Sequence, residues 1–466
     1  MNKKIEDKIK QDKIIQEIMP FLQGTQAHLV GGYIRDVFLN KETFDRDIIL
    51  IHPNICDLVK NIAQKINATF VELDKDWEIY RLVCADKKNY IDFAKAIDNN
   101  IEKDIKRRDI TINAIAYNIE KNEIFDLVNG LKDLSNKKIQ AICEQNFIDD
   151  PLRLLRAFRF CATTGFDIEE KTFDLIKKHA KLIENPAKER IQVEILKLFE
   201  GENCVKALKQ MNSTEMLEAI FPFIKDIKLI PPNAHHHLNL LEHSFETIQQ
   251  INNNMIKLPE EAKNLLGQNY LGEIKKYAFL KLAGFMHDIG KPKTWTIDEE
   301  TGRHRFIKHD SIGAELAPAY LKPLKFSKKQ IAYIQTLIKH HIYPSNVNIN
   351  NEKSVMKFLR KMDTNTTDII LLAIADRLSA KGPQITEEII NDNLSHLNTL
   401  LKRYLELLEE IKPLPKLLSG NEIMDILKIQ PSPKLGQIIA NLKEAQEDGE
   451  ITTKEEAINF IKNYPL

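Results

Sequence analysis

Apolar residues follow two patterns in about the first 130 positions of the chain. Short runs rich in β-branched and aromatic residues, bounded by polar clusters, predict β-strands, whereas apolar residues three and four positions apart predict helices. The predicted strands are Ala27–Val30, Asp47–Ile51, Thr69–Leu73, Ile79–Ala85, Tyr90–Ala94 and Ile124–Val128, and the predicted helices include Ile55–Ile66 and Thr111–Asn118. This alternation predicts an α/β domain, a mixed sheet with helices, which we call the head.

After about residue 145 the strand pattern largely disappears, and apolar residues three and four positions apart continue almost to the end. The remainder of the chain is therefore predicted to be predominantly all-α. Proline and polar clusters predict breaks at Ile230–Asn233, Lys381–Pro383 and Lys412–Pro415. No repeat of 20–50 residues is evident, which disfavours a solenoid.

Composition is that of an ordinary globular protein. The chain has 466 residues, of which 43% are hydrophobic and 29% charged, so several domains are expected. It has no run of about 18 apolar residues and no secretory signal, which predicts a cytoplasmic protein without membrane contact. A formal net charge of zero argues against indiscriminate nucleic-acid binding but permits local basic patches. Five scattered cysteines, none in Cys-x-x-Cys spacing, indicate neither a disulfide framework nor a zinc ribbon.

A glycine pair and two carboxylates form the first candidate site. Gly31 and Gly32 open a predicted helix, where the backbone can approach a phosphate and the exposed N–H groups attract anions. Asp45 and Asp47 are two positions apart on a strand and so share one face. Two such carboxylates can hold a pair of Mg²⁺ ions for displacement at phosphorus, which indicates nucleotidyl transfer. Arg35 either contacts a phosphate oxygen or is a surface arginine paired with Asp36.

The segment Lys106–Ala114 places three basic residues before a predicted amphipathic helix. Arg108 is a candidate to reach triphosphate oxygens, with Asp109 and Asn113 holding the ribose or orienting Arg108. The alternative is a helix N-cap at Asp109 or Thr111 beside a solvated basic turn. Asp92, on a neighbouring predicted strand, is either a third acidic group or a residue that caps or pairs.

A third motif covers residues 149–160. Asp150 is predicted to be an N-cap, with Pro151 at the first helical position. Arg153, Arg156 and Arg159 recur every three residues and predict a cationic stripe on the helix, which is alternatively a solvated face. One carboxylate and one guanidinium a helical turn apart match the Watson–Crick edges of cytosine and adenine, since a carboxylate accepts from the exocyclic amine.

These motifs, in this order, resemble the class II tRNA nucleotidyltransferase and bacterial poly(A) polymerase family over about residues 24–200. The motifs are Leu29–Asp36 with Asp45 and Asp47, Arg107–Ala114, Asp126 and Gly130 with Asp133-Leu134, Asp149–Phe160, and Glu189-Arg190-Ile191 with Glu194. The resemblance implies an α/β nucleotidyltransferase head. It also implies an enzyme that adds C and A residues to the tRNA 3′ end from CTP and ATP and releases pyrophosphate.

The resemblance also implies roles for single residues. Mg²⁺ would bind Asp45 and Asp47, and the base would be read by Asp150 and Arg153. The other nucleotide-binding residues would be Gly32, Arg35, Arg108, Asp109, Asn113, Arg156 and Arg159. The expected partners are tRNA, CTP and ATP, with no DNA.

Two positions depart from the family pattern. Asp149 stands where the family usually has Glu. Only twelve residues, 95–106, separate Ala94 from Arg107, where members that add the complete CCA tail typically carry a longer flexible loop. A short stretch here is associated in the family with enzymes that add CC and leave the last A to a partner. A poly(A) polymerase is a further alternative, because it shares the head motifs.

His243, His287, Asp288 and Asp376 form a separate set beside apolar predicted helices. Buried groups of this kind need partners or a metal, although a single buried histidine is usually a satisfied core residue. In this order they resemble the HD phosphohydrolase superfamily over about residues 235–385. This implies a second divalent metal in the HD domain, with His309, His340 and His341 as candidates to complete a two-metal site. The histidines within 233–237 are as consistent with a solvent-facing position.

The implied HD site is either a phosphohydrolase, in one version with a head that only binds RNA, or a structural element. Together the patterns predict four domains: a nucleotidyltransferase head (1–145), a helical neck and RNA-binding region (146–225), an HD domain (226–385) and a helical C-terminal tail (386–466).

Overall fold

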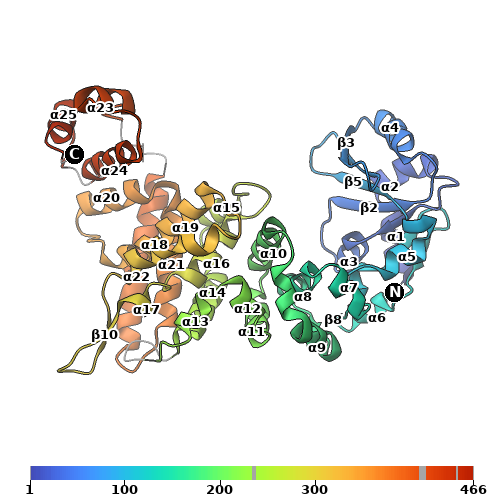
Figure 1. Cartoon of the computed structure of the whole chain (residues 1–466), viewed down its shortest axis with the longest axis horizontal. Helices are drawn as coiled ribbons and strands as arrows, with labels where there is room; N and C mark the ends of the chain where they lie inside the picture. Colours follow the sequence, from blue (N-terminus) through green and yellow to red (C-terminus); the bar gives the residue numbers. More distant parts are fainter. Residues whose placement is uncertain (1, 233–237, 409–415, 448–449, 465–466) are drawn as a thin grey trace. The chain divides into compact units, whose positions relative to one another are not determined.

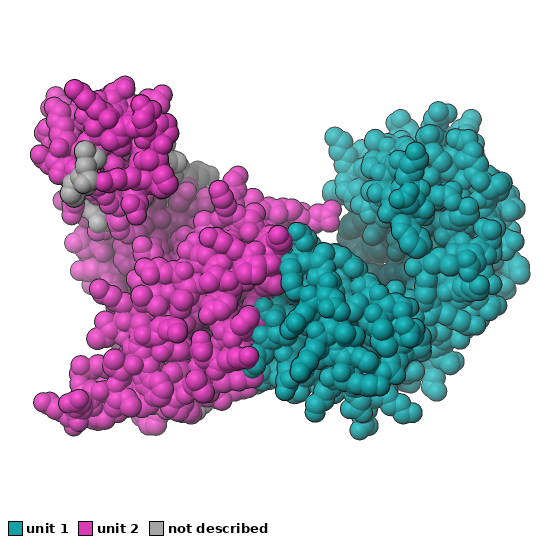
Figure 2. Space-filling model, in the orientation of Figure 1, with its two compact units in different colours: residues 1–220 teal, residues 221–466 magenta. Residues whose placement is uncertain are grey.

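The computed structural model describes residues 2–232, 238–408, 416–447 and 450–464. Contacts divide the chain into two compact units, residues 1–220 and 221–466 (Figures 1 and 2). The histidines within 233–237 and the predicted break at Lys412–Pro415 lie outside the described residues, as does the end of the break at Ile230–Asn233.

A seven-stranded mixed sheet forms the centre of the head. The strand order is β3-β4-β5-β2-β1-β6-β7, and β2 and β5 run parallel while the other neighbours run antiparallel. The strands are β1 (His28–Val30), β2 (Asp45–Leu50), β3 (Thr69–Asp74), β4 (Ile79–Val83), β5 (Tyr90–Lys95), β6 (Ala116–Asn118) and β7 (Glu123–Phe125). The predicted α/β head with a mixed sheet is confirmed.

Helix α4 (Ile55–Lys65) shows how an apolar helical face packs in the head. Asn54 caps its first turn by accepting a hydrogen bond from the Asp57 N–H at 3.1 Å. Ile55, Val59 and Ile62, on one helical face, are buried. The other helices of the head are α1 (Asn2–Lys10), α2 (Lys13–Ile18), α3 (Gly32–Phe38), α5 (Ile101–Lys106) and α6 (Gly130–Ser135), and α4 is Ile55–Lys65.

The predicted helix Thr111–Asn118 is wrong. A 3₁₀ turn at Thr111–Asn113 leads instead into β6, which pairs with β1 and β7. Residues 109–119 are all buried, so the strand lacks the alternation of polar and apolar residues that marks a half-buried strand. A short, wholly buried run cannot be assigned from its periodicity.

The rest of the first unit is helical apart from one short strand pair, β8 (Lys138–Ile139) with β9 (Asp167–Ile168). Helix α8 (Leu152–Thr164) packs against α10 (Lys188–Glu200) and α11 (Cys204–Ser213), with Leu155 and Phe158 fully buried. The helices are α7 (Glu144–Asp149), α8 (Leu152–Thr164), α9 (Glu170–His179), α10 (Lys188–Glu200), α11 (Cys204–Ser213) and α12 (Met216–Ile220).

The second unit is built around α16 (Lys276–Met286), in which Ala278–Met286 are all buried, and the apolar helix α21 (Thr366–Ser379). A hairpin of β10 (Trp295–Ile297) and β11 (His304–Phe306) joins α17 to α18. The helices are α13 (Ile224–Ile227), α14 (Leu240–Met255), α15 (Glu260–Gly267), α16 (Lys276–Met286), α17 (Lys291–Thr294), α18 (His309–Leu321), α19 (Lys328–His340), α20 (Glu352–Met362), α21 (Thr366–Ser379) and α22 (Glu387–Leu407).

Three more helices close the chain: α23 (Gly420–Leu427), α24 (Pro433–Glu447) and α25 (Lys454–Lys462). They share an apolar cluster that includes Ile423, Ile438 and Ile461. The predominantly helical second part of the chain is thereby confirmed. Within the described ranges, every helix is too short or too polar to cross a lipid bilayer.

Candidate functional site

Three carboxylates from two parallel strands form an acidic cluster in the head. Asp45 and Asp47 lie on β2, and Asp92 on β5 is the register partner of Asp47. One carboxylate oxygen from each residue lies within 4.8 Å of the other two. Asp92 also forms an ion pair with Arg81 at 2.7 Å. It is therefore both a third acidic group of the cluster and a residue that pairs. The oxygen donors suit a hard divalent cation such as Mg²⁺.

The electrostatics of Asp47 fit a bound cation. Burial raises the pKa of its carboxyl to about 6, and the neighbouring Asp45 and Asp92 act in the same direction. The charges of Arg108 and Arg81 oppose this shift. Carboxylates that are held together in a partly buried position repel one another, and binding of either a proton or a metal ion lowers this repulsion. The residues present therefore fit a divalent metal.

Gly31 brings the backbone next to this cluster. Its φ of +78° is in a region that glycine adopts readily, and an added Cβ would overlap with Asp47 Oδ2. The same Cβ position is 3.6 Å from Arg108 Nη1, so Arg108 lies at the cluster too. Gly32 begins α3, and a Cβ there would be 2.9 Å from Arg35 Nη2.

Arg35 is held in place by neighbours. It forms two hydrogen bonds to the Asp36 carboxylate, at 2.9 and 3.0 Å, and donates to the Asn113 side-chain oxygen. Its guanidinium also lies 5.0 Å from the ring centre of Phe160. The pairing with Asp36 is thus present, but Arg35 is mostly buried rather than a free surface residue.

The side chain of Asp109 does not cap an α-helix. Its buried carboxylate accepts hydrogen bonds from Arg156 Nε at 2.7 Å and from Asn113 Nδ2 at 3.1 Å. Burial raises the pKa of Asp109, but the charge and hydrogen bonds of Arg156 outweigh it and the pKa is lowered overall. Arg108 lies instead near the buried Asp104, at 3.6 Å.

The arginines of α8 are paired rather than arrayed toward solvent. Arg156 also contacts Glu194 of α10 at 3.3 Å, and Arg159 Nε lies 2.8 Å from the same carboxylate. The Arg159 guanidinium stacks 4.0 Å from the ring centre of Phe160. Burial lowers the pKa of Arg159 to about 10, against the opposing charge of Glu194. The solvated-stripe interpretation is wrong for these residues, and Glu194 is their common partner.

The predicted N-cap at Asp150 is wrong, because Pro151 is the N-cap of α8 and Asp150 lies one position earlier, at the end of α7. Its backbone carbonyl accepts from the Arg153 N–H at 3.0 Å, whereas its carboxylate accepts two hydrogen bonds from Arg190, at 2.9 and 3.2 Å. Arg153 Nε is 3.9 Å from that carboxylate, and Arg153 donates to the Asn146 carbonyl at 3.0 Å. The candidate base-reading pair is therefore side by side, with Arg190 as a further partner.

A second cluster brings histidines and aspartates together within the second unit. His243 Nε2 lies 3.3 Å from His287 Nε2 and 3.1 Å from Asp376 Oδ1. His287 Nε2 is 3.1 Å from Asp288 Oδ2. His309 and His341 join the cluster, with their Nε2 atoms 3.3 Å apart. We call these six residues the HD cluster: His243, His287, Asp288, His309, His341 and Asp376.

Backbone carbonyls orient three of these imidazoles. The Nδ1 atoms of His287, His309 and His341 lie 2.7 to 2.8 Å from carbonyl oxygens. With Nδ1 as the donor, each Nε2 turns its lone pair toward the cluster, as metal-binding histidines do. Imidazole and carboxylate donors together suit a divalent transition metal. His340 lies outside the cluster, with its ring 6.1 Å from that of Tyr343.

Charge in the HD cluster also fits a cation. Burial lowers the pKa of His287, but Asp288 and Asp376 outweigh it and raise the pKa to about 10. Burial lowers the pKa of His341 to about 4, and the charges of His287 and His309 act in the same direction, against Asp288 and Asp376.

Comparisons with known proteins match this architecture. A family model for the poly A polymerase head domain matches residues 27–140, one for the probable RNA and SrmB-binding site of polymerase A matches 165–228, and one for the HD domain matches 240–381. The chain belongs to the family of tRNA nucleotidyltransferases and poly(A) polymerases.

Members of this family resemble the chain over almost its whole length. The A-adding tRNA nucleotidyltransferase of Deinococcus radiodurans is 29% identical, covering 96% of each chain. The CC-adding tRNA nucleotidyltransferase of Thermus thermophilus is 28% identical, covering 95% of this chain and 94% of that protein. The solved CCA-adding enzyme of Thermotoga maritima in complex with tRNA superposes with a TM-score of 0.57 at 19% identity, over 99% of this chain and 98% of that chain, and so shares the fold.

Two cationic residues have side-chain partners at the candidate sites that the sequence motifs do not assign. Arg190, which lies within the quoted motif Glu189-Arg190-Ile191, binds Asp150, and Lys291 Nζ lies 2.6 Å from Asp288 Oδ2. Their partners are fixed by tertiary packing. Lys291 follows His287-Asp288 by one short turn, which is the signal that spacing offers.

Proposed function

We propose that the protein is a tRNA nucleotidyltransferase that extends the tRNA 3′ end from CTP and ATP with Mg²⁺ as cofactor. The acidic cluster of Asp45, Asp47 and Asp92, beside Gly31 and Arg108, carries this proposal. In the reaction the terminal hydroxyl oxygen attacks the α-phosphorus, and pyrophosphate leaves. Bound Mg²⁺ would stabilise negative charge on the attacking and leaving oxygens.

The chain's own residues would position the nucleotide. Asp45 and Asp47 would hold the metal, while Arg108 and Arg35, with the backbone at Gly32, would contact phosphate oxygens. Asp150 and Arg153 would read the base edge, with the carboxylate accepting from the exocyclic amine and the guanidinium donating to the ring acceptors. Arg190, whose side chain is 53% exposed, can release part of the Asp150 carboxylate for this purpose.

The buried network behind these residues would fix their geometry. Asp109 binds Arg156 and Asn113, Asn113 accepts from Arg35, and Arg156 shares Glu194 with Arg159. We propose that this network, rather than direct nucleotide contact by each member, accounts for the nucleotide-binding role implied for Asp109, Asn113, Arg156 and Arg159.

A specific observation favours addition of CC over complete CCA. Residues 95–106 form a 3₁₀ turn at Ile97–Asn99 followed by α5, which Asn100 caps. Ile101 and Ile105 are buried in an apolar cluster with Val30 and Ile49. This packed segment stands where family members that add CCA typically have a longer flexible loop. The Thermus relative is likewise named for CC addition, whereas the Deinococcus relative is named for addition of A.

Incorporation with defined primers tests the proposal. Purified protein is incubated with Mg²⁺ and tRNA ending before the CCA, after the first C or after CC, with CTP or ATP supplied singly and together. Addition of two C residues with little ATP use indicates a CC-adding enzyme, and addition of both indicates a CCA-adding one. A long A tract would indicate a poly(A) polymerase.

Matched variants assign the chemistry to the acidic cluster. Asp45→Ala and Asp47→Ala should abolish incorporation while tRNA binding survives, and Glu72→Gln, at an exposed position on β3, should keep full activity. Retained turnover in Asp47→Ala would refute the metal assignment. Phosphate release that disappears with His287→Ala, without any CTP incorporation, would instead support a phosphohydrolase whose head only binds RNA.

We further propose the division into a head (1–145), a neck and RNA-binding region (146–225), an HD domain (226–385) that holds a second divalent metal, and a tail (386–466). Because the proposed substrate is tRNA, we propose that the enzyme works in the cytoplasm.

A further inference from the structure

A buried ion pair lies behind the acidic cluster of the head, on the other face of the sheet. Arg46 stands between Asp45 and Asp47 on β2, so its side chain points away from theirs. Its guanidinium binds one oxygen of Asp12, at 3.0 Å from Nε and 2.7 Å from Nη2. The side chains of Arg46 and Asp12 are only 7% and 10% exposed. In such a position each charge depends on its partner, because water does not reach either of them freely.

Asp12 joins two elements of the candidate active site. Its Oδ2 atom, which binds Arg46, also accepts a hydrogen bond from the Tyr33 hydroxyl at 2.6 Å. Tyr33 lies in the first turn of α3, two positions after Gly31, whose backbone lies against Asp47. The other oxygen of Asp12 caps α2 by accepting from two backbone N–H groups. One carboxylate therefore connects β2 and α3 on the side opposite to the acidic cluster.

Arg46 also contacts the segment that leads into β5. Its Nη1 atom donates to the Asn89 side-chain oxygen at 2.8 Å, and Asn89 directly precedes β5, the strand of Asp92. Each carboxylate of the acidic cluster is thus on the strand of Arg46 or on the strand that begins beside Asn89. A shift of β2 against β5 or α3 would change the separation of these oxygens. Mg²⁺ is sensitive to such changes, because it demands nearly ideal octahedral geometry.

The charges within this network balance each other. Burial raises the pKa of Asp12, but hydrogen bonds from Arg46 and Tyr33 outweigh it and lower the pKa overall. The Arg46 guanidinium also lies 5.5 Å from the ring centre of Tyr33. Since Asp12 neutralises the charge of Arg46, the pair is better suited to holding the strands in place than to offsetting the negative charge of the acidic cluster.

We propose that Asp12 and Arg46 are positioning residues, which hold β2, α3 and the start of β5 in the arrangement in which the acidic cluster binds Mg²⁺. This inference rests on the proposed function of the acidic cluster in nucleotidyl transfer. It extends the candidate active site to a residue before the first sequence motif, which starts at Leu29. Both residues act through the strands, and neither is a catalytic residue.

Three variants of the full-length chain test the pair. Arg46→Met removes the guanidinium but keeps a long side chain, and Asp12→Asn removes the charge but keeps a residue that caps helices well. The double variant removes both charges. CTP incorporation is measured over a range of Mg²⁺ concentrations, and calorimetry measures Mn²⁺ binding without nucleotide or tRNA. Circular dichroism and urea midpoints identify conditions in which every variant is folded.

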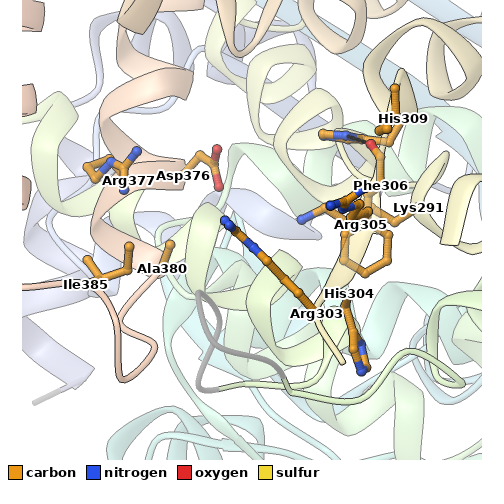
Figure 3. Close-up of a pocket in the computed structure, with 11 residues that line it drawn as sticks. Lys291, Arg303, His304, Arg305, Phe306, His309, Asp376, Arg377, Ala380 and Ile385 are labelled. Carbon is orange, nitrogen blue, oxygen red and sulfur yellow. Dashed lines mark hydrogen bonds between the residues drawn. The ribbon is translucent and has the colours of Figure 1, made fainter. Parts of the chain in front are cut away.

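The HD cluster is a second place at which Mn²⁺ can bind. Two of its residues, His309 and Asp376, also line a cavity of about 450 Å³ in the second unit (Figure 3). Calorimetry of the whole chain therefore reports both clusters together. The contribution of the head is the difference between each variant and the same variant that also carries Asp47→Asn.

We expect each single variant to raise the Mg²⁺ concentration for half-maximal incorporation about tenfold or more, and to weaken Mn²⁺ binding by the head by a similar factor. Saturating Mg²⁺ should bring kcat back to within about threefold of the parent, because a higher concentration compensates for weaker binding. The double variant should lose no more affinity than one single variant, since residues that act as a pair are not additive.

Two control variants separate positioning from loss of stability. Lys276→Met removes one partner of a buried pair with Asp368 in the second unit, where the side chains are 9% and 0% exposed. This variant should lower the urea midpoint but leave the Mg²⁺ requirement of incorporation unchanged. Glu17→Gln, at an exposed position on α2, should change neither property.

Two results would overturn the proposal. The first is an unchanged Mg²⁺ requirement and unchanged Mn²⁺ affinity in folded Arg46→Met and Asp12→Asn. The second is a loss of kcat that saturating Mg²⁺ does not restore, without weaker Mn²⁺ binding, since the pair would then stabilise the fold alone. If the parent incorporates no nucleotide, the proposed function fails, whereas the Mn²⁺ affinities of the head still decide whether the pair positions the acidic cluster.

Discussion

The backbone of Gly31 lies so close to Asp47 that an added Cβ atom would overlap with the Asp47 Oδ2 atom. The acidic cluster therefore depends on the lack of a side chain at a position outside the strands that carry the carboxylates. Any residue larger than glycine must displace the carboxylate or move the start of α3.

Gly31→Ala should lower kcat/KM for CTP incorporation at least 100-fold. Gly24→Ala is the matched control, because Gly24 has a φ of +76° but nothing within 4 Å of its added Cβ. The control should cost about 1–2 kcal/mol in unfolding free energy from backbone strain and leave turnover intact. Equal losses of activity in the two variants would show that strain, not contact with Asp47, is responsible.

Metal binding by the head should weaken in acid. The pKa of Asp47 is raised to about 6, so its carboxyl is mostly ionised at pH 7.5 and mostly protonated at pH 5, where protons compete with the metal. Calorimetric titration with Mn²⁺ should show affinity falling up to tenfold per pH unit below pH 6. Asp47→Asn, titrated in parallel, should lack this pH dependence of Mn²⁺ affinity. A parent affinity that stays constant from pH 7.5 to 5 would contradict the prediction.

Arg156→Met should destabilise the first unit by about 3–5 kcal/mol, because it leaves the buried carboxylate of Asp109 without its main partner. Urea unfolding measures the loss. Lys103→Met, which breaks an exposed pair with Asp98, should cost less than about 1 kcal/mol.

The ion pair between Asp109 and Arg156 also predicts that the stability of the first unit depends on pH. The pKa of Asp109 in the folded state is lowered, so its contribution is present above the usual carboxyl range of about 4 and is lost as pH falls below it. Acid should therefore destabilise the parent more than Arg156→Met. A parallel decline of both proteins would exclude Asp109 as a source of acid sensitivity.

Adjacent histidines should differ in metal binding. His341 belongs to the HD cluster and His340 does not, so His341→Ala should reduce the number of Mn²⁺ ions retained after dialysis by at least one per chain. His340→Ala should retain the parent's metal content, as measured by atomic absorption. A loss in both variants, or in neither, would contradict the ligand set.

Much of the head could be predicted from sequence, because its strands are marked by patterns among residues that are close together in the chain. Alternation on β2 places Asp45 and Asp47 on one face, and strand boundaries follow the polar clusters. Strand β6 could not be predicted, because burial on both faces removes the pattern on which such a prediction depends.

Long-range partners were the main gap at the candidate site. Arg156 finds Asp109 across 47 positions and Glu194 across 38, so no spacing along α8 reveals whether its arginines face solvent. His340 and His341 are both candidates from the sequence, and the structure brings only His341 into the HD cluster, for a related reason. Consecutive residues at the end of a helix point in directions about 100° apart, and only packing decides which of them faces the cluster.

The parallel pairing of β2 with β5 has a consequence for how the head is made. Antiparallel strands that follow each other in the chain, such as β3 and β4, can pair soon after synthesis. Asp92 reaches Asp47 only when β5 pairs with β2, and the β3–β4 hairpin lies between these two strands in the chain. The three carboxylates of the acidic cluster therefore come together only when β5 joins β2, so the candidate metal site cannot form before this non-local pairing.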